Sequence, residues 1–163
     1  MNDEVARVFT AQARHHLQED FMPRVGKCVE QLSAKELWWR PNENCNSIGN
    51  LLMHLSGNVR QWIIAGVGQQ PDVRKRDEEF AARQGAGARQ LMENLRSTVD
   101  EACQVIETLT GPQLLETRRI QVYDVSVLEA VFHVVEHFSH HVGQIIYITK
   151  SLRDTDLKFY QGL

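Results

Sequence analysis

Apolar residues recur every three or four positions over four long stretches, and this period most constrains the fold of the chain. The stretches cover about residues 3–32, 47–66, 88–109 and 126–151. The period matches one face of an α-helix, and almost no segment alternates long enough to form a strand. The sequence shows no repeated unit, and 163 residues suit one domain. We therefore predict an all-α four-helix bundle that forms a single domain over residues 1–163.

Local signals mark the ends of these helices. Pro23 predicts a kink or an interruption in the first helix. Ser33 and Glu36 have the spacing of a capping box and predict a short helical turn. Ser126 and Glu129 repeat that spacing at the start of the last helix, and Asn46 or Ser47 can cap the second. The positions that the helical period turns inward are Val5, Val8, Phe9, Ala13, Leu17, Phe21 and Val25 in the first helix, and Ile48, Leu51, Leu52, Leu55, Val59, Trp62 and Ile63 in the second.

Two connections are longer than a simple bundle needs. Residues 68–87 are rich in charge and exceed the usual bundle loop, so they are a candidate lid or wall, with a solvated crossover as an equal alternative. Residues 117–126 contain a brief β-like run that predicts a small hairpin or an extended corner. These two connections indicate a topology other than the simplest up-down order.

Composition and charge argue against several classes of function. The 18 basic and 21 acidic side chains form no long block of one sign, which disfavours nucleic-acid binding. No apolar stretch is long enough to cross a bilayer. The amino terminus carries acidic residues where a signal peptide would be basic, so we expect a cytoplasmic protein. Cys28, Cys45 and Cys103 are odd in number and form no CxxC, so no disulfide framework or thiolate zinc site is predicted.

Five of the seven histidines fall on two of the predicted helices. His137 and His141 are one turn apart, about 40° around the helix, so both imidazoles can reach one cation. Both border the apolar face of the last helix. His54 lies on the shoulder of the apolar face of the second helix, which makes it the natural third ligand. His133 and His140 fall towards the polar side of the last helix, as pocket-rim residues or partners of the ligands.

Three imidazoles with an open position suit zinc, nickel, cobalt or iron(II). Isolated histidines near a bundle core are nevertheless often structural and metal-free, so a hydrogen-bonded histidine network is an alternative. Other templates for catalysis are absent: the sequence has no HExxH, no GxSxG, no Gly-rich phosphate loop and no Glu three positions before a His. These absences make ferritin-like chemistry and nucleophilic catalysis by a side chain poor hypotheses.

Two segments resemble the DinB/YfiT-like superfamily, specifically one of its small bacterial branches. They are NSIGNLLMHLSGNVRQWI at residues 46–63 and VLEAVFHVVEHFSHHVGQIIYITK at residues 127–150. The distinctive elements are HLSGN, which contains His54, and HxxxHxGQ, which contains His137, His141, Gly143 and Gln144. The RKRDEEF and TRRIQVYD stretches also fit that branch, so the resemblance extends over nearly the whole chain.

The resemblance implies a four-helix bundle that holds one divalent metal through His54, His137 and His141. Characterised members include metal-dependent transferases and isomerases that use low-molecular-weight thiols such as bacillithiol, mycothiol or glutathione, and the fold resembles dimeric proteins. By this analogy we expect a divalent-metal-dependent enzyme, a thiol-dependent S-transferase or a related hydrolase or isomerase, that acts on a small molecule as a homodimer with zinc or nickel.

Several neighbouring residues are candidates for supporting roles. Asn58 and Gln144 would orient groups at the site, Glu136 or His133 would handle protons, and the stretch from Arg74 to Arg76 would attract an anionic substrate. Trp62 shares the helix of His54 and would line a pocket, although core packing is its more common role. The alternative function is a non-catalytic bundle that binds a metal or a partner, in which His140 or a carboxylate would close the coordination sphere.

Overall fold

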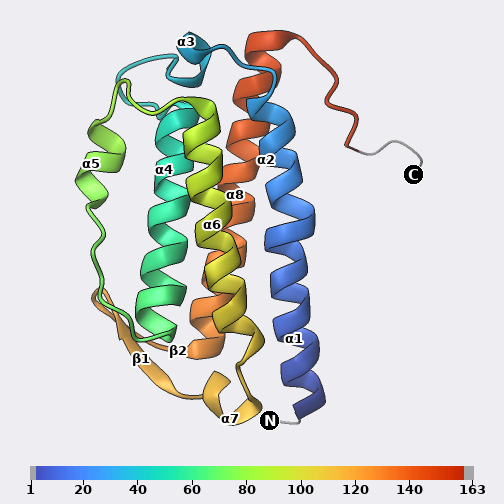
Figure 1. The fold of residues 1–163 in the computed structure, drawn as a ribbon, viewed down its shortest axis with the longest axis vertical. Coiled ribbons are helices and arrows are strands. Elements are labelled where there is room, and N and C mark those ends of the chain that lie inside the picture. Colours follow the sequence, from blue (N-terminus) through green and yellow to red (C-terminus); the bar gives the residue numbers. More distant parts are fainter. Residues whose placement is uncertain (1–2, 160–163) are drawn as a thin grey trace.

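The computed structural model describes residues 3–159, and residues 1–2 and 160–163 of the predicted domain lie outside the described part. Four long helical bodies form a bundle, as predicted (Figure 1). The first body consists of α1 (Asp3–His15), the π-helical η1 (His16–Phe21) and α2 (Met22–Val29), and the second consists of α4 (Ile48–Val59) and the π-helical η2 (Arg60–Val67). The third and fourth bodies are α6 (Ala88–Glu107) and α8 (Val127–Arg153). The shorter elements between them are α3 (Ala34–Leu37), α5 (Arg76–Ala81), α7 (Gly111–Leu114), β1 (Thr117–Ile120) and β2 (Tyr123–Ser126).

The first helical body continues through Pro23 instead of breaking there. Proline lacks the backbone N–H that an α-helix uses, so an interior proline disturbs the hydrogen bonding of the preceding turn. The π-helical segment η1 occupies that turn, directly before α2, in which Pro23 is one of the first residues. A local change of helical type, rather than an interruption, therefore accommodates the proline.

The long helices do not follow a simple up-down order. The first body packs against α6 and α8, and α4 also packs against α6 and α8. In Figure 1 the first body and α8 run upward, whereas α4 and α6 both run downward. Because α4 and α6 are parallel neighbours, the chain between them has to return along the length of the bundle. This confirms the prediction that the long connections change the topology.

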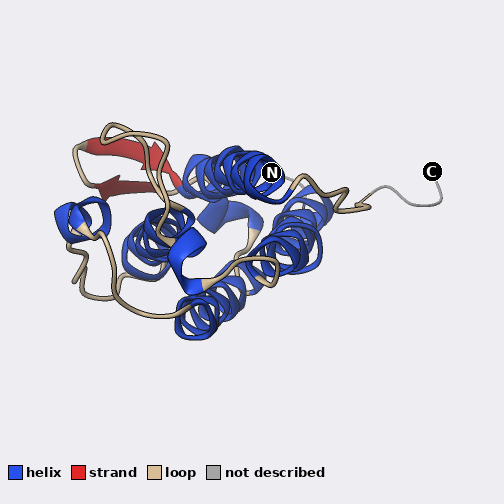
Figure 2. Cartoon of the chain, turned by 90° about the horizontal axis from the view of Figure 1, so that it is seen from above, coloured by secondary structure: helices blue, strands red, loops and turns tan. Residues whose placement is uncertain are grey.

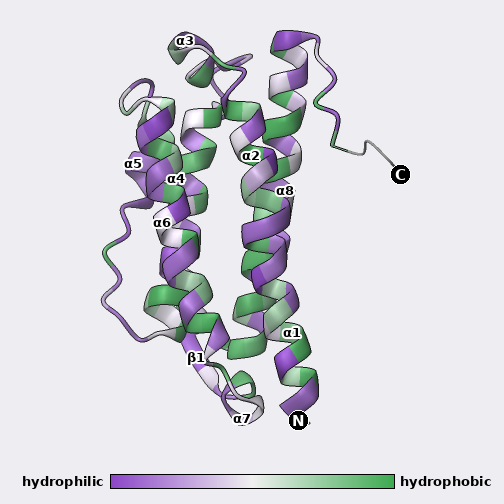
Figure 3. Ribbon diagram, turned by 45° about the vertical axis from the view of Figure 1, so that its right-hand side comes forward, coloured by the Kyte–Doolittle hydropathy of each residue, from purple (hydrophilic) through white to green (hydrophobic). Residues whose placement is uncertain are grey.

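The core lies between the four bodies and is built from the predicted apolar faces. All seven inward positions predicted for the second helix are buried. Figure 3 shows hydrophobic and hydrophilic residues recurring in turn along the long helices. The prediction was wrong for Val5 and Val8, which are 52% and 55% exposed. The buried stripe of α1 runs instead through Ala6, Thr10 and Ala13, and Val5 and Val8 lie about 100° and 160° from Ala6 around the helix.

The crossover from η2 to α6, residues 68–87, is partly ordered as helix. It contains α5, which packs against α4 on the outside of the bundle (Figure 1). The side chain of Asn50 donates to the backbone oxygens of Glu79 and Ala82, both at 2.8 Å. These buried hydrogen bonds fix the crossover to α4, so it forms a wall of the bundle rather than a purely solvated connection.

The predicted hairpin is present before the last helix. β1 and β2 pair antiparallel, with Ile120 opposite Tyr123 at the turn. Figure 2 shows this hairpin to one side of the helices seen end on. Ile120 is buried against Gly66 of η2, where a Cβ would lie 2.5 Å from Cδ1 of Ile120. The absence of a side chain at Gly66 therefore allows the hairpin to close against the second body.

Among residues 3–159, no helix combines the length and apolar character that a membrane crossing needs.

Candidate metal centre

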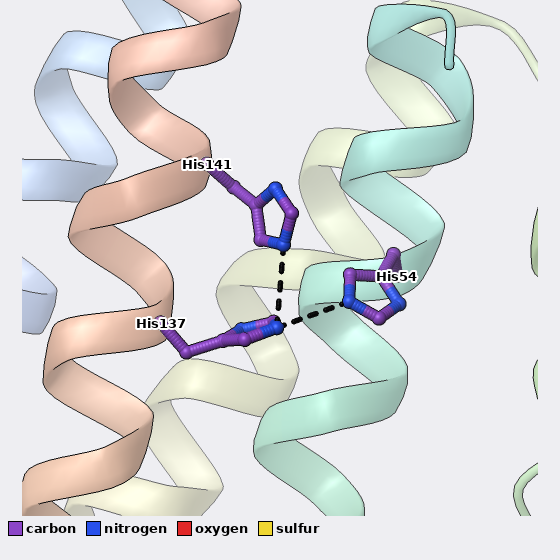
Figure 4. A group of neighbouring side chains, drawn as sticks. All are labelled: His54, His137 and His141. Carbon is purple, nitrogen blue, oxygen red and sulfur yellow. Dashed lines mark hydrogen bonds between the residues drawn. The ribbon is translucent and has the colours of Figure 1, made fainter. Parts of the chain in front are cut away.

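Three histidines from two adjacent helices converge on one point in the bundle. His54 comes from α4, and His137 and His141 come from successive turns of α8 (Figure 4). Nε2 of His137 lies 3.1 Å from Nε2 of His54 and 3.2 Å from Nε2 of His141. One ring nitrogen from each residue lies within 4.8 Å of the others, a grouping that could hold a metal ion.

Hydrogen-bond acceptors behind two of the rings bear on which ring nitrogen carries the proton. Nδ1 of His141 lies 2.7 Å from Oε1 of Gln144, an oxygen that can only accept. His141 therefore donates from Nδ1, and its Nε2 presents a lone pair towards His137. Nδ1 of His54 lies 3.0 Å from Oε2 of Glu79, which likewise accepts. When His54 donates to Glu79 as His141 donates to Gln144, at most one proton remains among the three Nε2 atoms, and the donor set then fits a cation.

The environment also keeps the imidazoles of His137 and His141 neutral. Burial, followed by the neighbouring His141 and His54, lowers the pKa of His137 to about 3. Burial likewise lowers the pKa of His141, although the hydrogen bond to Gln144 acts in the opposite direction. Metal ligation requires neutral imidazole, so protons compete little for these two rings near neutral pH.

A buried ion pair lies directly behind His54. Arg74 donates from Nε to Oε1 of Glu79 and from Nη2 to Oε2, both at 2.8 Å. The side chains of Arg74 and Glu79 are 3% and 8% exposed. Burial raises the pKa of Glu79, but hydrogen bonds from Arg74 and His54 outweigh it, and the pKa lies below its ordinary value. The carboxylate is therefore ionised where it meets His54.

Gly57 makes room for this ion pair against α4. A Cβ at this position would overlap Oε1 of Glu79 and would lie 2.9 Å from Nε of Arg74. The glycine of the HLSGN element thus has a specific steric role, one turn of helix from His54.

The stretch from Arg74 to Arg76 is not a free basic patch. The Arg74 guanidinium is buried in the pair with Glu79, and Lys75 pairs with Glu78 at 3.2 Å. Arg76 lies over the ring of Phe80, 4.9 Å from its centroid. The expectation that this stretch attracts an anionic substrate was wrong for Arg74, because its charge is already neutralised inside the protein.

The rings of His133 and Trp62 contact each other at a tilted angle of 39°, one turn of α8 before His137. Their ring centroids are 4.1 Å apart, and the centroid of His133 lies 5.4 Å from that of His137. His133 is half-buried and so lies deeper than its predicted place on the polar side, and burial lowers its pKa. Tyr123 of the hairpin also stacks on Trp62, with ring centroids 6.3 Å apart.

Three further predicted residues, Asn58, His140 and Glu136, lie outside the group of converging histidines. Asn58 is buried at 4% exposure, and its Oδ1 has no hydrogen-bond partner among residues 3–159. His140 is exposed, with Nε2 3.3 Å from Nε2 of Gln144, and is not in the convergent group. Glu136 is exposed and lines a groove with His16 and Asp20 between η1 and α8.

The model of a family described as a protein of unknown function (DUF1572) matches residues 4–161. The chain belongs to this family. Two solved structures share the fold of this DUF1572 member. A DinB-like protein (YjoA) from Bacillus subtilis is 19% identical, with a TM-score of 0.68 over 92% of this chain and 98% of that one. A DinB-like protein from Bacillus cereus is 13% identical, with a TM-score of 0.64 over 80% and 85%.

No curated protein matches the DUF1572 member. The family match and the two structures confirm the DinB-like resemblance, and at these identities the structures speak for the fold alone. The DUF1572 member is thus a DinB-like helical bundle in which three histidines are brought together.

A cavity of about 570 Å³ lies next to the histidine cluster of the DUF1572 member. It is lined by His140 and by Gln144, the residue that holds His141. Cys45, which is half-buried and free, faces it from the loop before α4. Its other lining residues are Pro41, Asn44, Asn46, Leu51, Gly143, Tyr147 and Ile148. The ionisable side chains in this lining are the imidazole of His140, the thiol of Cys45 and the phenol of Tyr147, so the cavity suits a neutral group.

Sequence reasoning missed Glu79. It stands beside Asp77 and Glu78 in a run of three acidic residues, and nothing in the local pattern separates them. Only the packing of α5 on α4 selects Glu79 as the buried member, because Glu78 points outward with its side chain 69% exposed.

Proposed function

We propose that His54, His137 and His141 hold one divalent transition metal, with zinc or nickel as the best candidates. The convergence of three Nε2 atoms, with acceptors behind two of the rings, carries this proposal. Zinc and nickel both accept imidazole nitrogen, and three protein ligands leave a position for substrate. The DinB-like resemblance implies metal ligands at the same three residues.

We further propose that the protein is an enzyme, a thiol-dependent S-transferase or a related hydrolase or isomerase. When bound, the metal would supply a Lewis acid that lowers the pKa of a coordinated thiol or water. The chain itself would orient the ligands through Gln144 and Glu79. It would also exclude water beside the centre through the contacting rings of His133 and Trp62.

The cavity beside Gln144 is the proposed place for the small-molecule substrate, a low-molecular-weight thiol or its electrophilic partner. Its amide and phenol groups can hydrogen-bond to a substrate without requiring opposite charge. A homodimer in the cytoplasm, with no nucleic-acid partner, remains part of this proposal, from the charge balance and the family resemblance.

Metal content per chain tests the first step. We expect about one equivalent of a transition metal by elemental mass spectrometry in untagged protein purified without chelator, and little in His54→Ala or His137→Ala. Absence of metal after reconstitution would contradict the metal centre.

A screen of the metal-loaded protein with cellular thiols paired with electrophiles and esters then tests the enzyme. Turnover that is lost in His137→Ala would support catalysis. A tightly loaded protein with no turnover would favour the non-catalytic bundle. That alternative has one observation in its favour, because His140 and Gln144, rather than the three converging histidines, line the neighbouring cavity.

A further inference from the structure

The ion pair between Arg74 and Glu79 presents two opposite groups to the same atom of His54. Oε2 of Glu79 and Nη2 of Arg74 each lie 3.0 Å from Nδ1 of His54. The carboxylate can only accept a hydrogen bond, and the guanidinium can only donate one. The two neighbours therefore favour different tautomers of the same ring.

The tautomer decides whether His54 can be a ligand. If Nδ1 donates to Glu79, Nε2 carries a lone pair and points at Nε2 of His137. If Nδ1 accepts from Arg74, the ring proton lies on Nε2 and blocks coordination there. A neutral imidazole has one N–H, so only one arrangement holds at a time.

We infer that Glu79 is a positioning residue that holds His54 with its proton on Nδ1, so that Nε2 is available to the metal. This inference rests on the proposed metal centre. The pair of a buried imidazole N–H with a carboxylate is a strong, charge-assisted hydrogen bond. Carboxylates behind metal-bound histidines fix ring orientation and raise the basicity of the ligating nitrogen.

Glu79 also balances charge beside the site. Arg74 is buried with its guanidinium 3.0 Å from the His54 ring, and a cation there opposes the approach of a dication. The carboxylate neutralises Arg74 through two hydrogen bonds. Its Oε2, which accepts one of them, also faces His54. Loss of Glu79 would therefore remove an acceptor and expose a positive charge at once.

The position of Glu79 is fixed by contacts that do not involve the histidines. Asn50 donates to its backbone oxygen, and Gly57 leaves the space that its carboxylate occupies. Arg74 in turn donates to both oxygens of the carboxylate. The acceptor is thus in place before any metal binds.

Nitrogen-15 NMR of the imidazole rings in the metal-free protein tests the tautomer without any substitution. We expect His54 to show a protonated Nδ1 and an unprotonated Nε2. A His54 ring protonated on Nε2 in the parent protein would overturn the inference. The measurement does not depend on whether a variant folds.

Zinc affinity then tests the consequence, with Glu79→Leu, which removes the acceptor, compared with Glu78→Leu. Glu78 lies beside Glu79 in α5, but its carboxylate is 69% exposed and pairs with Lys75. We expect affinity about 10–100-fold weaker in Glu79→Leu and unchanged in Glu78→Leu. Circular dichroism of both variants checks that the bundle is intact.

The outcomes separate the two proposals. Normal zinc binding by the parent, with equal affinities in the two variants, would overturn the role of Glu79 and leave the metal centre standing. Failure of the parent to bind zinc or nickel would overturn the metal centre, and the role of Glu79 in metal binding with it.

Discussion

Nε2 of His137 lies 3.1 Å from Nε2 of His54, although 83 residues separate them in the sequence. Neither helix can build this arrangement alone, because α4 supplies one ring and α8 supplies the other two. The candidate metal centre therefore depends on the native packing of α4 against α8, and its chemistry can be tested residue by residue.

His140 and His141 are adjacent on α8, but their side chains point in different directions. His141→Ala should reduce the metal content to a small fraction of one equivalent, because it removes one of three convergent nitrogens. His140→Ala should keep nearly one equivalent, since its exposed ring lies against Gln144. Elemental mass spectrometry of both variants makes the comparison. Equal loss in the two would indicate that His140 closes the coordination sphere.

Gln144 should influence metal affinity through His141. Its Oε1 accepts from Nδ1 of His141 at 2.7 Å and so leaves Nε2 free. Gln144→Leu removes the acceptor and should weaken zinc binding about 10-fold, whereas Gln144→Glu keeps an acceptor and should bind at least as tightly as the parent. Competition titrations with a zinc-binding dye would measure both affinities. A Leu variant that binds like the parent would show that Gln144 does not orient the ring.

Acid should destabilise the metal-free protein in part through His137. The pKa of this ring is about 3 in the folded protein, against an ordinary value of 6.5. Between these values the unfolded chain binds the proton and the folded protein does not, so the free energy of unfolding falls as the pH falls. Thermal melts from pH 6.5 downward should show a shallower decline in Tm for His137→Gln than for the parent. Parallel declines would indicate that His137 is not held neutral.

Gly57→Ala should displace the buried ion pair from α4. The new methyl group would overlap the Glu79 carboxylate, and we expect a cost of about 1–3 kcal/mol in the free energy of unfolding, together with weaker zinc binding. Gly26→Ala is the matched control, because a Cβ there meets only Cε of Met92 at 3.8 Å. Urea denaturation would report the difference. A Gly57→Ala variant as stable as the Gly26→Ala control would contradict the packing described for Glu79.

Two phenylalanines on α8 test the bundle core itself. Phe138 is fully buried and stacks on Phe21, with ring centroids 5.8 Å apart. Phe138→Ala should cost about 3–5 kcal/mol in the free energy of unfolding. Phe132→Ala, at a position that is 61% exposed, should cost far less. Equal losses in urea denaturation would contradict the orientation of α8.

Much of the fold could be predicted because its determinants are local. Helical periods, two capping boxes and a β-like run located the four long bodies and the hairpin, and the angle between His137 and His141 follows from one helix. The start of α1 was less predictable. Val5 and Val8 lie off the buried stripe of α1, which runs through Ala6, Thr10 and Ala13.

The support behind the histidines could not be predicted in the same way. Glu79 reaches His54 from a segment 25 positions later, through the docking of α5 on α4. The ring contact between His133 and Trp62 likewise joins two helices, whereas periodicity describes one helix at a time. Gln144 was singled out from the HxxxHxGQ element, but its hydrogen bond to His141 appears only in the structure.

The parallel course of α4 and α6 has a consequence for how this bundle can diverge or be redesigned. Because the chain must travel back along α4 before α6 begins, the crossover passes beside His54 and delivers Glu79 to it. A rearranged bundle that joined α4 to an antiparallel neighbour by a tight turn would retain all three histidines and lose the carboxylate. In this architecture the helices determine which atoms meet, and the crossover, anchored to α4 through Asn50, determines how one of them is protonated.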